Sequence, residues 1–271
     1  MYIGHSFPLS DILDALSTMN SLEFLEIRNV EVHQDDDIQH LRRTKLPGLR
    51  ELQLGVDAIT CVALLDHLKT PPTCALTYNA PNLLTTAEVA EDVFTPLVSM
   101  LVKFARRYFK SHPPTNVVVH RAHGMLCFSD MNHRVTSGFL ALFRRSDQLD
   151  FLMDAVKTFF SQFSLPRFPK TTRLWLELSA ETPSHLWRPF LERFPSAQVM
   201  LMSIRDIGYF KAVVEILLQT AVLLSLKIIK LRPGEQFDPI HPKAHELEVI
   251  AIFEVMRMLS GRPVQVMRVN Q

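Results

Sequence analysis

Apolar positions recur at a fixed spacing near the start of the chain. When the segment Met19–Val32 is moved along by 27 positions, five of its apolar residues fall on apolar residues of Leu46–Ile59. The coinciding pairs are Met19 and Leu46, Leu22 and Leu49, Leu25 and Leu52, Ile27 and Leu54, and Val32 and Ile59. Self-similarity at a fixed period is the signature of a repeat protein. We therefore expect small structural units that stack along the chain.

Extended and helical patterns alternate along nearly the whole sequence. Strand-like segments start near positions 22, 49, 74, 115, 172, 197, 226 and 263, and most of these starts lie 24 to 29 residues apart. Capping residues, prolines and helical spacing of apolar residues predict helices between them. The predicted helix starts are Ser10, Asp57, Thr95 with Pro96 as the first helical residue, Ser146, Thr182, Arg205 and Pro242. Gly124–Phe128 and Gly138–Phe143 are weaker strands that would pair as a hairpin.

The shared skeleton LxxLxxLxL is the leucine-rich-repeat pattern, which has a period of 20 to 29 residues. One strand and one helix cannot bury their own apolar side, so such units stack into a parallel sheet. The predicted fold is an α/β leucine-rich-repeat-like solenoid, a curved parallel sheet with helices on its convex face. We expect a single domain over residues 1–271, with regular repeats at about 8–80, an irregular segment at about 111–145 and further repeats at about 146–271.

The alternation of side chains along each strand predicts a binding face. Leu25 and Ile27 would point into the core, and their neighbours would then point outward. The outward residues of the clearest strands are Glu26, Arg28, Glu51, Gln53, Arg173, Trp175 and Glu177. A tryptophan between an arginine and a glutamate, facing away from the core, has the composition of an interface hot spot. The alternative is that Trp175 packs under a neighbouring loop.

Amino-acid composition and charge limit the expected partners and the expected compartment, but they do not indicate a reaction. The formal net charge is +1, which gives no electrostatic reason to expect nucleic acid or an anionic membrane as partner. The most hydrophobic stretch, Ala212–Leu226, has 15 residues and contains Glu215 and Gln219, whereas a membrane span needs about 20 apolar residues. Three cysteines without short spacing suggest buried thiols in a reducing compartment. The expected protein is soluble and intracellular, in the cytoplasm or the nucleus.

The sequence gives only weak evidence for a catalytic or metal-binding site. The run Asp35–Asp37 lacks the glycine and glutamate of a calcium loop, and a solvated loop is the simpler interpretation. The loose cluster of His120, His123, His133, Cys127 and Asp130 matches no zinc spacing. Phosphate-binding glycine loops and a GxSxG nucleophile elbow are absent from the sequence. We therefore expect no catalytic residue, no cofactor and no metal.

The run LPGLRELQL with its continuation VDAITCVALLDHLKTPPTCALTYNA resembles the leucine-rich-repeat region of fungal (basidiomycete-type) F-box proteins. The resemblance covers about Pro8 to Ala80 and is looser but compatible beyond. It implies a substrate receptor, in which an F-box docks on the adaptor of a cullin-type ubiquitin ligase and the repeats hold the target. No F-box pattern precedes the first repeat, since Pro8 already opens a repeat helix. An adaptor partner is therefore expected only if an F-box lies outside this chain.

The sequence is compatible with three functions. The first is a protein-interaction module, the substrate-recognition region of an F-box-type receptor that holds a protein on its concave face. The second is a stand-alone leucine-rich-repeat scaffold with no role in ubiquitin transfer. The third is a small α/β enzyme with an unrecognised site, which would show a doubly wound sheet and a deep polar pocket.

Overall fold

The structure is a computed structural model, and it describes residues 8–30, 41–79, 91–122, 125–130, 138–144, 153–163, 168–177, 184–204, 213–218, 223–233 and 250–268, the last without 252, 256 and 259. It is a mixed α/β protein with mostly parallel sheet pairing. Its contacts divide the chain into two units, each described here by itself. Unit 1 comprises Met1–His112 and His123–Thr158, and unit 2 comprises Pro113–Ala122 and Phe159–Gln271.

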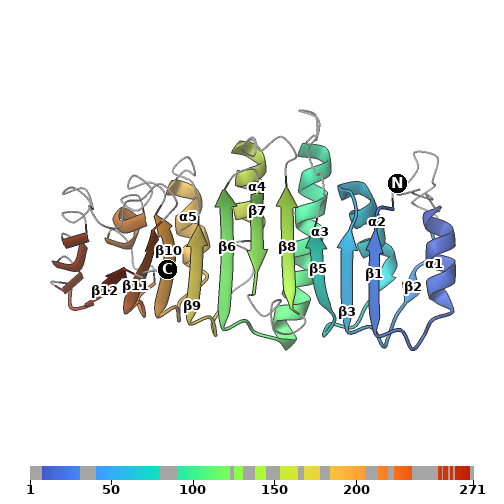
Figure 1. The fold of residues 1–271 in the computed structure, drawn as a ribbon, viewed down its shortest axis with the longest axis horizontal. Coiled ribbons are helices and arrows are strands. Elements are labelled where there is room, and N and C mark those ends of the chain that lie inside the picture. Colours follow the sequence, from blue (N-terminus) through green and yellow to red (C-terminus); the bar gives the residue numbers. More distant parts are fainter. Residues whose placement is uncertain are drawn as a thin grey trace. The chain divides into compact units, whose positions relative to one another are not determined.

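Unit 1 contains a sheet in the order β1-β3-β5-β8-β7. The first four strands are parallel and β7 is antiparallel to β8, as the reversed arrow in Figure 1 shows. The strands are β1 (Phe24–Arg28), β3 (Glu51–Gly55), β5 (Ala75–Asn79), β7 (Met125–Ser129) and β8 (Phe139–Arg144). Two short strands, β2 (Thr44–Lys45) and β4 (Leu68–Lys69), form a separate parallel pair. The predicted hairpin of the two weaker strands is confirmed.

The repeat in the sequence is also the register of the sheet. Leu25 pairs with Leu52 and Ile27 pairs with Leu54 across β1 and β3. These pairs have the same offset of 27 positions that aligns the apolar residues in the sequence. Because side chains alternate along a strand, this register places equivalent apolar residues on the same face.

Helices cover the apolar face of the unit 1 sheet. They are α2 (Ala58–His67) and α3 (Glu91–Ser111), and Figure 1 shows α3 behind β5 and β8. Helix α1 (Leu9–Ser17) contacts β2, where the hydroxyl of Thr44 donates a hydrogen bond of 3.0 Å to the backbone oxygen of Leu13. The ring of Phe94 lies 5.3 Å from that of Phe143 on β8. The ring of Phe109 lies 5.5 Å from that of Phe139, also on β8. All four rings are buried, so α3 and the sheet share one aromatic core.

Unit 2 contains a sheet whose described strands are all parallel, in the order β6-β9-β10-β11-β12. The strands are β6 (Asn116–Ala122), β9 (Arg173–Glu177), β10 (Val199–Ile204), β11 (Ile228–Pro233) and β12 (Gln265–Arg268). Helices α4 (Met153–Phe163), which begins in unit 1, and α5 (Ser184–Leu191) contribute aromatic residues. Phe160 packs against Phe190 at 5.5 Å between ring centroids, and Phe168 stacks on Phe194 at 4.7 Å.

Several helices start at other residues than the sequence predicts. Helix α1 begins at Leu9 after Pro8 and has no side-chain cap, so Ser10 lies inside the helix. Helix α3 begins at Glu91, and Pro96 lies within it rather than at its first position. The predicted starts at Ser146, Thr182, Arg205 and Pro242 fall outside the described residues.

The helix after β3 begins as predicted. Asp57 is its N-cap, and its carboxylate accepts a hydrogen bond of 2.9 Å from the backbone N–H of Thr60. This bond satisfies one of the N–H groups that a helix start leaves unpaired. Within the described part of the chain, none of the helices has the length and apolar character needed to cross a membrane.

Candidate protein-binding face

The sheet of unit 2 has one mainly apolar, buried face, which also holds the buried Arg121 of β6, and one mixed face. Leu174 and Leu176 of β9 are buried, whereas Arg173 is exposed and Trp175 and Glu177 are half-buried. The predicted alternation of inward and outward side chains on this strand is therefore confirmed. We call the face that carries Trp175 the outward face of unit 2.

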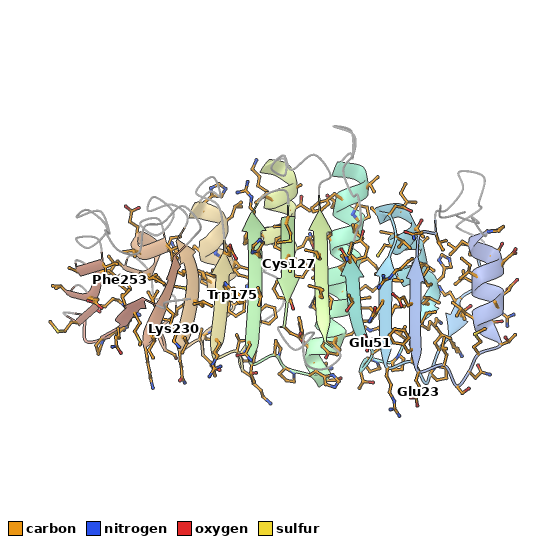
Figure 2. All side chains as sticks on the ribbon, viewed as in Figure 1. Glu23, Glu51, Cys127, Trp175, Lys230 and Phe253 are labelled. Carbon is orange, nitrogen blue, oxygen red and sulfur yellow. The ribbon has the colours of Figure 1, made fainter. Side chains whose placement is uncertain are left out.

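Trp175 belongs to a row of side chains that crosses the whole unit 2 sheet. Its Cα partners are Val118 on β6 and Leu201 on β10. The row continues to Lys230 on β11 and Met267 on β12. Figure 2 labels Trp175 and Lys230 on their strands. Residues in register on neighbouring strands lie on the same face, so these side chains form one continuous surface.

A second row lies beside it, two residues earlier on each strand. In this row Asn116, Arg173, Val199, Ile228 and Gln265 are successive Cα partners. Its central residues are apolar and its other members are polar. Five half-buried apolar residues of the two rows form what we call the Trp175 patch: Val118, Trp175, Val199, Leu201 and Ile228.

Glu177 is tied to a partner that the sequence does not suggest. Its Oε2 lies 2.8 Å from Nδ1 of His120, and the two side chains are only 14% and 17% exposed. The two residues are Cα partners on β9 and β6 although they are 57 positions apart. Because its carboxylate is occupied by this contact, Glu177 borders the patch and is not an open acidic group. Arg173 remains exposed on the same strand.

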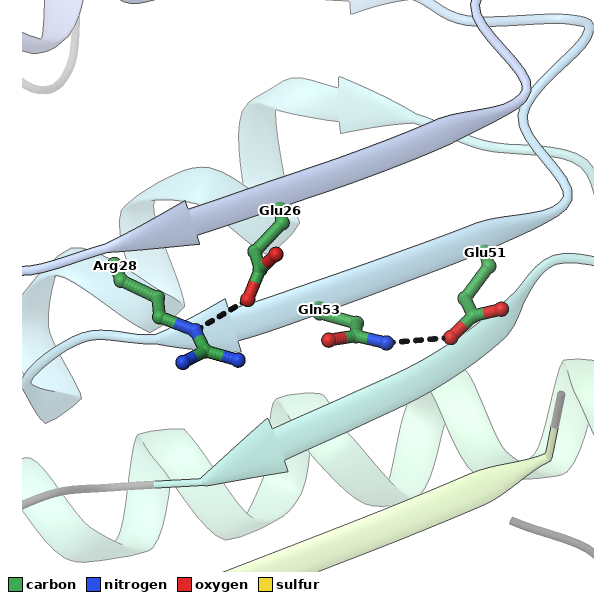
Figure 3. Close-up of polar contacts among 4 residues, drawn as sticks. All are labelled: Glu26, Arg28, Glu51 and Gln53. Atoms are coloured by element: carbon green, nitrogen blue, oxygen red, sulfur yellow. Dashed lines mark hydrogen bonds and ion pairs between the residues drawn. The ribbon is translucent and has the colours of Figure 1, made fainter. Parts of the chain in front are cut away.

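The predicted residues of unit 1 also lie on the mixed face of their sheet. Glu26 and Arg28 of β1 are exposed and form an ion pair with each other. Gln53 of β3 donates a hydrogen bond of 2.6 Å to Glu51 on the same strand. Figure 3 shows both contacts, each running along its own strand. Their polar groups partly satisfy one another, which leaves less free-energy gain for a partner that must replace these contacts.

Arg28 has a further contact that fixes its position. Its Cα partner on β3 is Gly55, and a Cβ added at Gly55 would lie 3.1 Å from Cγ of Arg28. The stem of the arginine therefore rests on the glycine. The structure brings Glu26, Arg28, Glu51 and Gln53 together in unit 1, and Arg173, Trp175 and Glu177 together in unit 2.

Sequence reasoning missed the apolar neighbours of Trp175. Val118, Val199, Leu201 and Ile228 occupy the same alternating positions on their strands as Trp175 does on β9. These residues lie in the predicted strands that start near positions 115, 197 and 226, so the alternation along those strands could have identified them. The sequence did not indicate that β6 pairs with β9, because these strands are not consecutive in the chain, so Val118 could not be placed beside Trp175.

The structure describes only some of the other candidate groups. Among the described residues, no cluster of His, Cys, Asp and Glu could hold a metal ion. His123, His133 and the acidic run 35–37 lie outside the described residues. Cys61 and Cys74 are fully buried, and burial raises the pKa of both thiols, that of Cys74 to about 12. A thiol with a raised pKa is a poor nucleophile, so these two cysteines act as core residues.

Comparison with known proteins assigns no family. No protein-family model matches the chain, and a search of the curated proteins finds no match.

Proposed function

We propose that the chain is a non-enzymatic protein-interaction module that binds a protein partner on the outward face of unit 2. The observation that carries this proposal is the Trp175 patch. Half-buried apolar side chains on the outward face of the strands are bordered by Arg173, Lys230 and the His120–Glu177 pair. An apolar centre with a polar rim is the usual anatomy of a protein–protein interface.

Trp175 is the expected energetic centre of this interface. It lies between Val118 and Leu201 within its row, and Arg173 extends from the same strand. Tryptophan and arginine are the residues most enriched among interface hot spots. A large ring that keeps part of its surface exposed can bury that surface only when a partner arrives.

The spacing of the strands supports the proposal that the units are leucine-rich-repeat-like and form a solenoid. Phe24 pairs with Glu51 and Glu51 with Ala75, offsets of 27 and 24 positions. Arg173 pairs with Val199 and Val199 with Ile228, offsets of 26 and 29 positions. All four offsets fall within the 20 to 29 residues of this repeat class.

Strand order supports an interaction module over an α/β enzyme. In each unit the parallel strands follow the chain in one direction, as β1-β3-β5-β8 and as β6-β9-β10-β11-β12. Doubly wound enzymes bind ligands at the point where the strand order reverses. Neither series of parallel strands contains such a reversal.

A role as the substrate-recognition region of an F-box-type ubiquitin-ligase receptor is the narrower form of the proposal. It rests on the resemblance of about Pro8–Ala80 to the repeat region of those proteins. A stand-alone scaffold with the same binding face is the alternative. Copurification of a cullin adaptor with the natural full-length gene product favours the receptor, and its reproducible absence favours the scaffold.

The proposal is tested by Trp175→Ala in quantitative affinity purification from the native cell. We expect a specific partner to be lost with an affinity decrease of about 30-fold, the effect of a hot spot worth about 2 kcal/mol. The melting temperature should fall by about 5 °C or less, because the ring is only half-buried. Arg188→Ala is the control, since this residue is exposed on α5 and its ion pair within the described part of the chain is with Glu192 on the same helix segment.

The same set of copurified proteins from both variants, at equal amounts, would contradict the proposal. So would unfolding of Trp175→Ala, because the tryptophan would then be part of the core.

A further inference from the structure

A second surface with distinct chemistry lies on the helical side of unit 1. Helices α2 and α3 pack against each other, and two neighbouring hollows open along them. The first, of about 290 Å³, is lined mainly by apolar side chains, including Ile59, Val62, Pro96 and Met100. The second has a volume of about 400 Å³. The two hollows share Asp66 and Met100 as lining residues, so they adjoin each other at these side chains, and we call the pair the groove and each hollow one half of it.

The second hollow is strongly basic. Its lining includes Arg43, Lys69, Lys103 and Arg107, and Asp66 is the single carboxylate among its lining residues. This local excess of positive charge contrasts with the formal net charge of +1 for the whole chain. A hollow lined by one sign of charge attracts groups of the opposite sign.

Most of this positive charge is not used within the fold. Arg43 reaches Asp66 only at 4.0 Å, and both side chains are largely exposed, so this ion pair contributes little. Among the described residues, no ion-pair partner is found for Lys69 or Lys103. The two lysines are therefore available to an acidic ligand.

Arg107 is already oriented. Its Nη2 donates hydrogen bonds of 3.1 Å to the backbone oxygen and to Oγ1 of Thr70. The guanidinium carbon lies 5.4 Å from the centre of the Phe104 ring. A cation held in one place loses less entropy when a ligand binds, which favours affinity.

A further pair of like charges stands next to the hollow. Lys45 on β2 and Lys69 on β4 are Cα partners, and both are exposed. Like charges directly opposite each other on a sheet destabilise it. An acidic group bound between these strands and α3 would relieve this repulsion.

We propose that this groove binds an acidic peptide segment of a protein partner, with its carboxylates in the basic half and an apolar side chain in the half beside Ile59. The positive charge of the basic half favours a ligand that carries carboxylates. The adjoining apolar half selects a peptide over a nucleic acid, whose backbone offers no apolar anchor. The cations are exposed and spread over several elements, which suits an extended ligand with several carboxylates better than one small anion.

This binding mode combines two known physical sources of peptide affinity. An apolar side chain seated between two helices gains from burial, as in other groove-binding peptides. Charges at the rim accelerate association and make binding sensitive to salt. The proposal does not depend on the Trp175 patch, which lies in unit 2.

The test uses three fluorescein-labelled peptides of twelve residues. The first carries four glutamates followed by two leucines; the second replaces glutamate by glutamine, and the third replaces leucine by serine. Fluorescence anisotropy with the whole chain should show binding of the first peptide. The second and third should bind at least about 10-fold more weakly, and raising the salt concentration should weaken binding of the first.

Protein variants locate the binding in the groove. We expect Lys69→Glu combined with Lys103→Glu to lower affinity for the acidic peptide by at least about 10-fold. Ile59→Ser, at a side chain that is 52% exposed, removes the apolar contact at little risk to folding. Arg106→Glu is the matched control, because it is exposed on α3 but does not line the hollow. Trp175→Ala should leave peptide affinity unchanged.

Three results would overturn the proposal. They are failure of the acidic peptide to bind, an equal loss of affinity in Arg106→Glu and in the lysine variants, and tighter binding of a single-stranded oligonucleotide of the same charge. Melting curves of each variant establish that the compared proteins are folded.

Discussion

The buried thiol of Cys74 links the stability of the fold to alkaline pH. Cys74 is fully buried, and its Sγ contacts the backbone oxygen of Ala75 at 3.3 Å. Removal from water is the largest cause of its raised pKa, about 12 against an ordinary value of 9.0. The nearby Arg107 acts in the opposite direction and lowers the pKa, but burial outweighs it.

The sign of the resulting pH dependence follows from this shift. A folded-state pKa above the unfolded value gives stability that is fully present below about pH 9 and is lost as the pH rises toward 12. By pH 10 the loss from Cys74 alone is about 1 kcal/mol. Tyr108, whose pKa burial raises to about 12, adds to the loss at higher pH.

We therefore expect the free energy of unfolding in urea to fall between pH 8 and pH 10, and to fall less in Cys74→Ala. The measurement is a set of urea titrations followed by circular dichroism. Stopping at pH 10 keeps the contribution of tyrosine small. A slope with pH that is identical in the variant would show that the Cys74 thiol does not carry the effect.

Residue identity predicted the outward face well and its neighbours poorly. The pattern of β9 alone places Trp175 opposite Leu174 and Leu176, and the structure agrees. The contact between Glu177 and His120 requires β6 to pair with β9, and nothing local to either strand encodes that pairing. Contacts that join distant segments depend on the whole topology, and a single sequence does not reveal them.

At the scale of elements, two helix starts show where a local sequence signal decides the structure and where packing in the folded chain overrides it. Asp57 acts as an N-cap where the sequence places a helix start, because aspartate can accept the N–H of the residue three positions on. Ser10 does not cap α1, because the helix begins two residues earlier than that cap implies, with Pro8 at the N-cap position and the side chain of Leu9 buried. Burial of an apolar side chain thus outweighs the preference of a serine for the cap.

This contrast gives a direct prediction for two similar substitutions. Asp57→Ala should lower the free energy of unfolding by about 1 kcal/mol, because it leaves the N–H of Thr60 without its acceptor. Ser10→Ala should change it by less than about 0.5 kcal/mol, since the hydroxyl donates a long hydrogen bond of 3.3 Å to the exposed Asp11 beside it. Chemical denaturation of both variants measures the difference. Equal effects would mean that the N-cap at Asp57 contributes nothing.

The strands were predicted more reliably than the helices. Each predicted strand start corresponds to a strand in the structure, and the hairpin of β7 and β8 is in place. Strand patterns are short, with alternating or continuous apolar residues, and they survive local variation. Helix starts were harder to place, because Pro96 lies within α3 rather than at its first position.

At the scale of the whole molecule, the two proposed binding surfaces differ in their chemistry. The outward face of unit 2 has an apolar centre with a polar rim, and the groove of unit 1 has one apolar and one basic half. The first suits a folded partner with a flat apolar surface, and the second suits an acidic peptide. Both surfaces fit a protein that works by holding other proteins.

The sequence predicted the first surface in part and the second not at all. Trp175 is visible as an unusual outward residue in a strand. The basic groove combines Arg43, Lys69 and Lys103 from three separate segments of the chain, and the total charge of the chain is nearly neutral, so the sequence does not reveal this local excess of positive charge. The sequence does show Arg107 near the end of a helix, but not that it faces β4.

The most direct measurement of the central claim is photo-crosslinking in the native cell, with benzoylphenylalanine in place of Trp175. The same replacement at Arg188, exposed on α5, is the control position. If the outward face of unit 2 binds a protein, illumination should link position 175 to a discrete partner, and position 188 should give no such product. The same products from both positions, or none from position 175 in folded protein, would contradict the account.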